Sequence, residues 1–94
     1  MSNPDPGQTA IKVLIVDDEP LAQRFMRSLV DKEPGLETVG CCNDGAQARQ
    51  EILRLEPDLV FLDVQMPKVS GVELMQGLSR TQQIPYVVFV TAFG

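Results

Sequence analysis

Four short apolar segments, separated by stretches of helical periodicity, restrict the fold of this 94-residue chain more than any other feature. The segments are Ile11–Val16, Leu36–Cys41, Asp58–Leu62 and Tyr86–Val90. Strands that alternate with helices are typical of a parallel sheet covered by helices on both faces. Crossovers between parallel strands are almost always right-handed, so few topologies remain. The sequence therefore predicts an α/β domain with a doubly wound parallel sheet.

Three stretches between these segments are predicted to form helices. The first runs from Pro20 to about Lys32, and the second, after a loop and cap at Asn43-Asp44-Gly45, from about Ala46 to Leu55. The third begins at the capping-box pattern Ser70-Gly71-Val72-Glu73 and ends near Ser79. The apolar residues expected to face the core are Leu21, Phe25 and Leu29, widened by Met26 and Val30, in the first helix, Ala48, Ile52 and Leu55 in the second, and Val72, Met75 and Leu74 or Leu78 in the third.

The amino-terminal residues have a different composition from the rest of the chain. Two prolines, Gly7 and polar side chains there cannot bury an apolar face, so we expect residues 1–10 to form a disordered leader and residues 11–94 to form the domain. There is no apolar run of about 18 residues and no signal-peptide pattern. We therefore expect a cytoplasmic protein that does not contact a membrane.

Charge and cysteine content exclude two further classes of function. The net charge is −5 and the eight basic residues are scattered along the chain, which is not the pattern of a nucleic-acid-binding surface. Cys41 and Cys42 are adjacent, and neither a CxxC motif nor a histidine accompanies them. We expect both thiols to be reduced and structural, with Cys41 on a strand.

Acidic residues follow two of the apolar segments. Asp17-Asp18-Glu19-Pro20 comes directly after Ile11–Val16, and Asp63 comes directly after Leu62. The carboxyl ends of parallel strands lie at one edge of a sheet, where open α/β sheets bind ligands. Two carboxylates about 4 Å apart repel by roughly 4 kcal/mol at an effective dielectric constant near 20. Such a cluster requires a cation, and oxygen ligands without histidine favour Mg²⁺ over zinc or copper.

Three motifs in this order carry a family resemblance. They are Val16-Asp17-Asp18-Glu19-Pro20, then Phe61-Leu62-Asp63-Val64-Gln65-Met66-Pro67 with Ser70-Gly71 behind it, then Val90-Thr91-Ala92. Together they resemble the receiver domain of two-component response regulators over Ile11 to Phe93. The segments Asp-Asp-Glu-Pro-Leu-Ala-Gln-Arg and Thr-Ala-Phe are also similar to receivers that precede a LytTR-type DNA-binding domain.

The resemblance implies a CheY-like, flavodoxin-like fold and a set of site residues. Asp63 would be the phosphoacceptor and would receive a phosphoryl group from a histidine kinase. The Thr91 hydroxyl would contact this phosphoryl group during a conformational switch. Asp18 and Asp63, with the backbone carbonyl of Gln65, would bind Mg²⁺ directly, and Asp17 would act through metal-bound water. Phosphoryl transfer depends mainly on positioning and charge neutralisation, which such a site supplies. The output implied is regulation of transcription through a further domain, and the chain itself is not expected to be an enzyme.

The chain departs from the receiver pattern after its fourth strand. Receivers continue with a fourth helix, a fifth strand and a fifth helix, so we expect an incomplete fold of four of the five βα units. The family's lysine at the end of strand five is missing, and Lys12 and Lys68 are not at matching positions, although Lys68 lies in the loop after Asp63. In the strand order 2-1-3-4-5 that the resemblance implies, the fourth strand would be an open apolar edge, which predicts a fragment of a longer regulator or a homodimer through that strand.

Two other functions stay open at this point. The missing lysine favours a pseudo-receiver, an interaction module that keeps the acidic pocket but is not phosphorylated. The other alternative is an enzyme, either a nucleotide binder or a phosphatase with an aspartyl phosphate intermediate. A nucleotide binder would need a Gly-rich loop after its first strand, where this chain has acids. The phosphatase family carries Asp-x-Asp, whereas Asp17 and Asp18 are adjacent.

Overall fold

The computed structural model describes residues 10–63 and 84–90. In chain order its elements are β1 (Ile11–Val16), α1 (Pro20–Asp31), β2 (Leu36–Cys42), α2 (Gly45–Leu55), β3 (Leu59–Asp63) and β4 (Tyr86–Val90). The predicted α/β class is confirmed, and each described element lies within one residue of its predicted bounds. The predicted helix at Ser70–Ser79 lies outside the described residues, and so does nearly all of the predicted leader.

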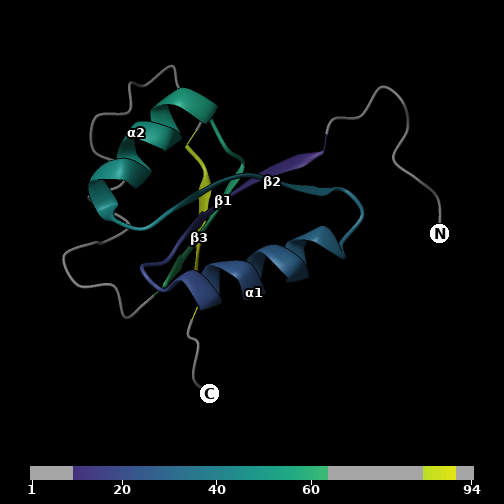
Figure 1. Cartoon of the computed structure of the whole chain (residues 1–94). Coiled ribbons are helices and arrows are strands. Elements are labelled where there is room, and N and C mark those ends of the chain that lie inside the picture. The colour runs from purple at the N-terminus through teal and green to yellow at the C-terminus, as the bar shows by residue number, and fades with distance from the viewer. Residues whose placement is uncertain (1–9, 64–83, 91–94) are drawn as a thin grey trace.

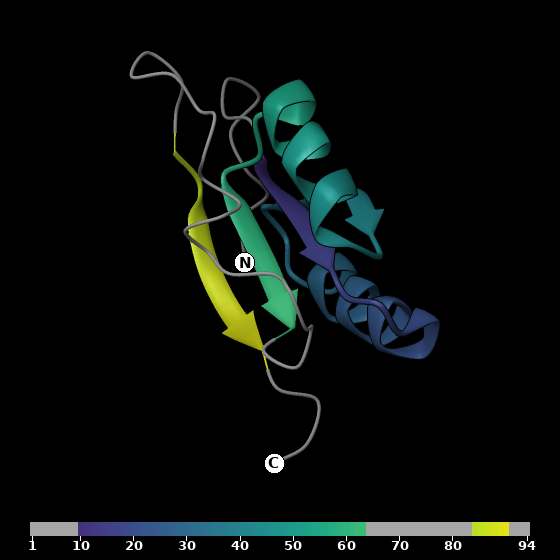
Figure 2. The same cartoon turned by 90° about the vertical axis from the view of Figure 1, so that its left-hand side faces the viewer.

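The four strands form one parallel sheet in the order β2-β1-β3-β4. Figure 2 shows the strands pointing in the same direction, with β4 beside β3 at one edge. This order confirms the 2-1-3-4 part of the expected receiver topology. Because the strands are parallel, the residues that follow β1 and those that end β3 lie at the same edge of the sheet.

The two helices of the described residues, α1 and α2, cover opposite faces of the sheet (Figure 1). On the α2 face, Leu14 and Val16 of β1 pack in one buried cluster with Ala48 and Ile52. On the α1 face, Val13 and Ile15 pack with Val30. Alternate side chains of a strand point to opposite faces, so β1 is buried on both sides. The central strand, whose end carries the acids, is therefore the best anchored part of the fold.

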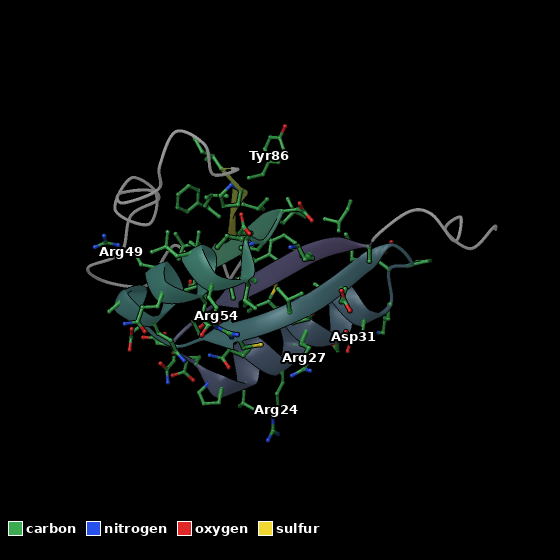
Figure 3. All side chains as sticks on the ribbon, turned by 90° about the horizontal axis from the view of Figure 1, so that it is seen from above. Arg24, Arg27, Asp31, Arg49, Arg54 and Tyr86 are labelled. Atoms are coloured by element: carbon green, nitrogen blue, oxygen red, sulfur yellow. The ribbon has the colours of Figure 1, made fainter. Side chains whose placement is uncertain are left out.

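Helix α1 is rotated relative to the prediction from its apolar periodicity. Val30 is 2% exposed and Met26 packs against the same cluster, as expected. Leu21 and Phe25, however, are 73% and 62% exposed, and Leu29 is also exposed, so the prediction that these three face the core is wrong. The helix presents its Met26–Val30 side to the sheet, and the adjacent apolar side stays on the surface. Arg24 projects away from the sheet (Figure 3).

Helix α2 begins and ends as its sequence predicts. The Asp44 side chain accepts a hydrogen bond from the Gln47 N–H at 2.7 Å, which is an N-cap contact. At the other end Glu56 adopts a left-handed conformation with φ 48°, and its N–H donates to the Ile52 carbonyl. Pro57, which cannot continue the helix, is buried beyond it. The short loop that follows leads directly into β3.

The outer strand β4 is less covered than the central strands. Val87 packs against the α2-side cluster, while Tyr86, Val88 and Phe89 are exposed. Tyr86 points away from the sheet (Figure 3). Among the described residues, neither α1 nor α2 is long and apolar enough to cross a membrane.

Candidate metal centre

The pairing of β1 with β3 brings two acidic strand ends together. Val16 lies opposite Leu62 in this ladder, so the next residues along each chain, Asp17 and Asp63, emerge side by side. Asp63 is the last residue of β3, one residue later than the predicted strand end. The strand register, rather than any loop, therefore sets the spacing between the two carboxylates.

Asp17, Asp18 and Asp63 form one cluster, as predicted from the sequence. One carboxylate oxygen from each residue lies within 4.8 Å of the others. Asp17 is 6% exposed, Asp63 is half-buried and Asp18 is exposed. The cluster thus runs from the interior of the sheet edge to solvent, so that one side is open to an incoming ligand.

Asp17 is the buried member of the cluster, and its surroundings disfavour its negative charge. Burial raises the pKa of its carboxyl group, and the charges of Asp63, Asp18 and Glu19 raise it further. A hydrogen bond from the Glu19 N–H to Asp17 Oδ1, at 2.9 Å, acts in the opposite direction. A cation at this place would therefore relieve an electrostatic penalty that the fold itself creates.

The backbone beside Asp17 is held by hydrogen bonds to the neighbouring strand. The Asp17 N–H donates to the Cys42 carbonyl at 3.0 Å, which extends the β1–β2 ladder past Val16. The side-chain amide of Gln23 in α1 donates to the Asp17 carbonyl at 2.6 Å and to the Cys42 carbonyl at 3.1 Å. Sequence reasoning did not single out Gln23, because a polar residue in the first turns of a helix gives no signal of such a contact.

The donor set fits Mg²⁺. All three side chains offer carboxylate oxygens, which are hard ligands, and Mg²⁺ is commonly bound through one or two carboxylates while it keeps several waters. Two oxygens that bind one Mg²⁺ at about 2.0–2.1 Å are at most about 4.2 Å apart, and the three oxygens here lie within 4.8 Å of one another. A carboxylate slightly farther from the ion can act through a bound water. When bound, Mg²⁺ would offset most of the negative charge of the cluster and attract phosphate oxygens to it.

The other residues predicted for the site are not all placed. Gln65 and Thr91 lie outside the described residues, as does Lys68. Lys12 is at the opposite end of β1, where its Nζ donates to the Leu55 carbonyl at 3.0 Å. Lys12 is therefore not a substitute for a lysine at the acidic edge.

The sequence matches the response regulator receiver domain over residues 13–94. The chain belongs to the response regulator receiver domain family. A receiver is a signalling module rather than an enzyme, so the nucleotide-binder and phosphatase alternatives are not supported. The expected family and fold are confirmed.

Relatives of known name and structure agree with this assignment. Transcriptional regulatory protein BtsR of Salmonella typhi is 47% identical over 83 residues, which cover 88% of this chain and 34% of that protein. The response regulatory domain of mrkE from Klebsiella pneumoniae is 36% identical with a TM-score of 0.70, covering 87% of this chain and 67% of that one. The response regulator domain of Thermotoga maritima CheB is 28% identical with a TM-score of 0.72, covering 87% and 60%. This chain spans about a third of the length of the BtsR relatives.

Proposed function

We propose that this receiver accepts a phosphoryl group on Asp63 from a histidine kinase, in a Mg²⁺-dependent reaction. The observation that carries the proposal is the cluster of Asp17, Asp18 and Asp63 at the carboxyl edge of the sheet. In this scheme Asp18, Asp63 and the Gln65 backbone carbonyl bind the ion, and Asp17 acts through a metal-bound water. Membership of the receiver family supports the same assignment.

Each side chain of the cluster has a separate task in the proposed reaction. A carboxylate oxygen of Asp63 attacks the phosphorus of the donor, forming an O–P bond while the bond from phosphorus to the leaving group breaks and the leaving group takes the electron pair. Asp17 and Asp18 hold the charge that draws the ion to the attacking carboxylate. Val90 lies opposite Asp63 in the β3–β4 ladder, and Thr91 follows Val90 in the sequence, which supports a role for the Thr91 hydroxyl beside the phosphoryl group.

The proposed signalling context follows from the family and its named relatives. A sensor histidine kinase would supply the phosphoryl group, and the output would be regulation of transcription in the cytoplasm through a LytTR-type DNA-binding domain. Identity to BtsR proteins, which are named as transcriptional regulators, supports this output. The receiver itself is not proposed to bind nucleic acid.

Intact mass measurement tests phosphorylation directly. The chain is incubated with Mg²⁺ and acetyl phosphate beside two variants, Asp63→Asn and Asp58→Asn, all shown to be folded by circular dichroism. Asp58 is a carboxylate immediately before β3, at the far end from Asp63, where it accepts a hydrogen bond from the Lys12 backbone N–H at 2.8 Å, so it is a matched control. The wild type and Asp58→Asn should gain one phosphoryl mass, and Asp63→Asn should gain none. A folded wild-type chain that gains none would favour the pseudo-receiver alternative.

A homodimer through the β4 edge is a second proposal. Among the described strands β4 is one of the two edge strands, and Val88 and Phe89 on it are exposed apolar residues. Exposed apolar edges favour pairing with a further strand, here β4 of a second copy. Sedimentation velocity should show a dimer that Val88→Lys weakens, and a monomer at all concentrations would contradict the pairing.

A further inference from the structure

The side chain of Gln23 connects three elements at the point where the acidic residues leave the sheet. Its Nε2 donates to the Asp17 carbonyl after β1, at 2.6 Å, and to the Cys42 carbonyl at the end of β2, at 3.1 Å. Its backbone N–H donates to the Glu19 carbonyl at 3.0 Å, in the first turn of α1. A side-chain amide nitrogen carries two N–H donors, and here it donates to two carbonyls, one just after β1 and one at the end of β2.

These hydrogen bonds act on the backbone of Asp17 rather than on its carboxylate. The Cys42 carbonyl accepts from the Asp17 N–H and from Gln23 Nε2, and Gln23 Nε2 also donates to the Asp17 carbonyl. Both polar groups of the Asp17 backbone are therefore held at the end of β2, the N–H directly and the C=O through Gln23. The segment from Asp17 to Glu19 is all that connects β1 to α1. Its two aspartates carry like charges that repel Asp63 and each other. Without a restraint on this backbone, that repulsion would move the carboxylates apart.

We propose that Gln23 is a positioning residue for the metal site, which holds the Asp17–Asp18 backbone so that both carboxylates meet Asp63 at one ion. The inference rests on the proposed Mg²⁺-dependent function. Groups that orient metal ligands from outside the coordination shell strongly affect metal affinity, although they never touch the ion. Gln23 would have this effect through backbone carbonyls instead of through the ligating side chains.

A purely structural role for Gln23 makes a different prediction. If its amide only fastened α1 to the sheet, its loss would lower stability but leave the Mg²⁺ affinity of the folded protein unchanged. If it positions the acidic residues, Mg²⁺ affinity falls in a protein that is still folded. The two roles separate when stability without Mg²⁺ and Mg²⁺ affinity are measured on the same variants.

The test compares Gln23→Met with Gln47→Met. Methionine keeps the length and the unbranched shape of glutamine but removes both N–H donors. Gln47 is the matched control, because it lies in the first turn of α2 and its Oε1 accepts from the Asn43 N–H at 3.2 Å instead of bonding to the backbone of the acidic segment. Each folded variant is titrated with Mg²⁺ and followed by backbone amide NMR shifts, and its urea midpoint is measured without Mg²⁺.

The Mg²⁺ dissociation constant of Gln23→Met should rise on the order of tenfold, while that of Gln47→Met should equal the wild-type value. If Gln23→Met does not fold, Gln23→Asn replaces it, since its shorter side chain keeps the amide but cannot reach both carbonyls. An unchanged Mg²⁺ affinity in a folded Gln23 variant, with normal binding by the wild type, would overturn this inference alone. A wild type that binds no Mg²⁺ would overturn the proposed function and this inference with it.

Discussion

Val16 and Leu62 are direct partners in the β1–β3 ladder, and this single register places Asp17 beside Asp63. Both partners are buried in the α2-side cluster, with Leu14 and Val60 beneath them. Because side chains alternate along a strand, a slip of one residue would turn this apolar set to the other face of the sheet. The core packing that fixes the register therefore also fixes the distance between the carboxylates of the site.

Asp17→Asn should stabilise the chain at neutral pH when no divalent cation is present. The pKa of Asp17 is raised in the folded state, chiefly by burial, so the folded protein holds this proton more tightly than the unfolded chain does. The resulting stability is present at low pH and is lost as the pH rises through the raised pKa. Asparagine stays neutral and can still accept the hydrogen bond from the Glu19 N–H. The urea midpoint of Asp17→Asn should therefore exceed that of the wild type at pH 7 and equal it at pH 3.

Mg²⁺ should reverse that difference. An ion that binds only the folded state raises the unfolding free energy by about 2.7 kcal/mol at a concentration of about 100 times its dissociation constant. The wild type should gain this stability, and Asp17→Asn should gain less. Glu37→Gln, which removes a charge from an exposed position of β2, is the control and should behave as the wild type does. A lower urea midpoint for Asp17→Asn than for the wild type at pH 7 without Mg²⁺ would contradict the claim that burial of the charged Asp17 carboxylate destabilises the fold.

The sheet and the acidic cluster could be predicted because local patterns determine them. Ile11–Val16 is apolar at four consecutive positions, which suits a strand covered on both faces, and the structure buries all four. The acids at 17, 18 and 63 follow apolar strands directly, and parallel strands bring such ends to one edge. Neither inference required knowledge of side-chain packing.

The orientation of α1 could not be predicted in the same way. Its apolar residues form two adjoining stripes, Leu21, Phe25 and Leu29 on one side and Met26 and Val30 on the next. Periodicity shows that such a helix is amphipathic but does not show which part of a broad apolar face meets the sheet. The Gln23 contacts could not be predicted either, because they depend on how α1 sits over the ends of β1 and β2.

A pair of alanine substitutions tests which side of α1 is buried. Val30→Ala removes two methyl groups from a closed cluster with Val13 and Ile15 and should lower the unfolding free energy by about 2 kcal/mol. Phe25→Ala removes a larger side chain from the surface and should change it by less than about 0.5 kcal/mol. Urea denaturation of both variants measures the difference. A larger loss for Phe25→Ala than for Val30→Ala would mean that the helix is turned the other way.

Cys42 should be inert in the folded protein. Burial, assisted by the charge of Glu51, raises the pKa of its thiol to about 12, and the thiolate is the form that reacts with alkylating agents. Iodoacetamide at pH 8 should leave Cys42 unmodified in the native chain and alkylate it rapidly in urea, as peptide mass mapping would show. Alkylation of native Cys42 at the rate found in urea would contradict its burial.

Mg²⁺ titration of the wild type and Asp18→Ala by calorimetry tests the shared acidic site most directly. Asp18 is exposed, so its replacement removes a ligand with little effect on the core, and circular dichroism checks that the variant is folded. Asp31→Ala, which removes an exposed carboxylate at the end of α1, is the matched control. The wild type and Asp31→Ala should bind one Mg²⁺, and Asp18→Ala should bind none. Equal affinity for all three proteins would show that Asp17, Asp18 and Asp63 do not form a metal site.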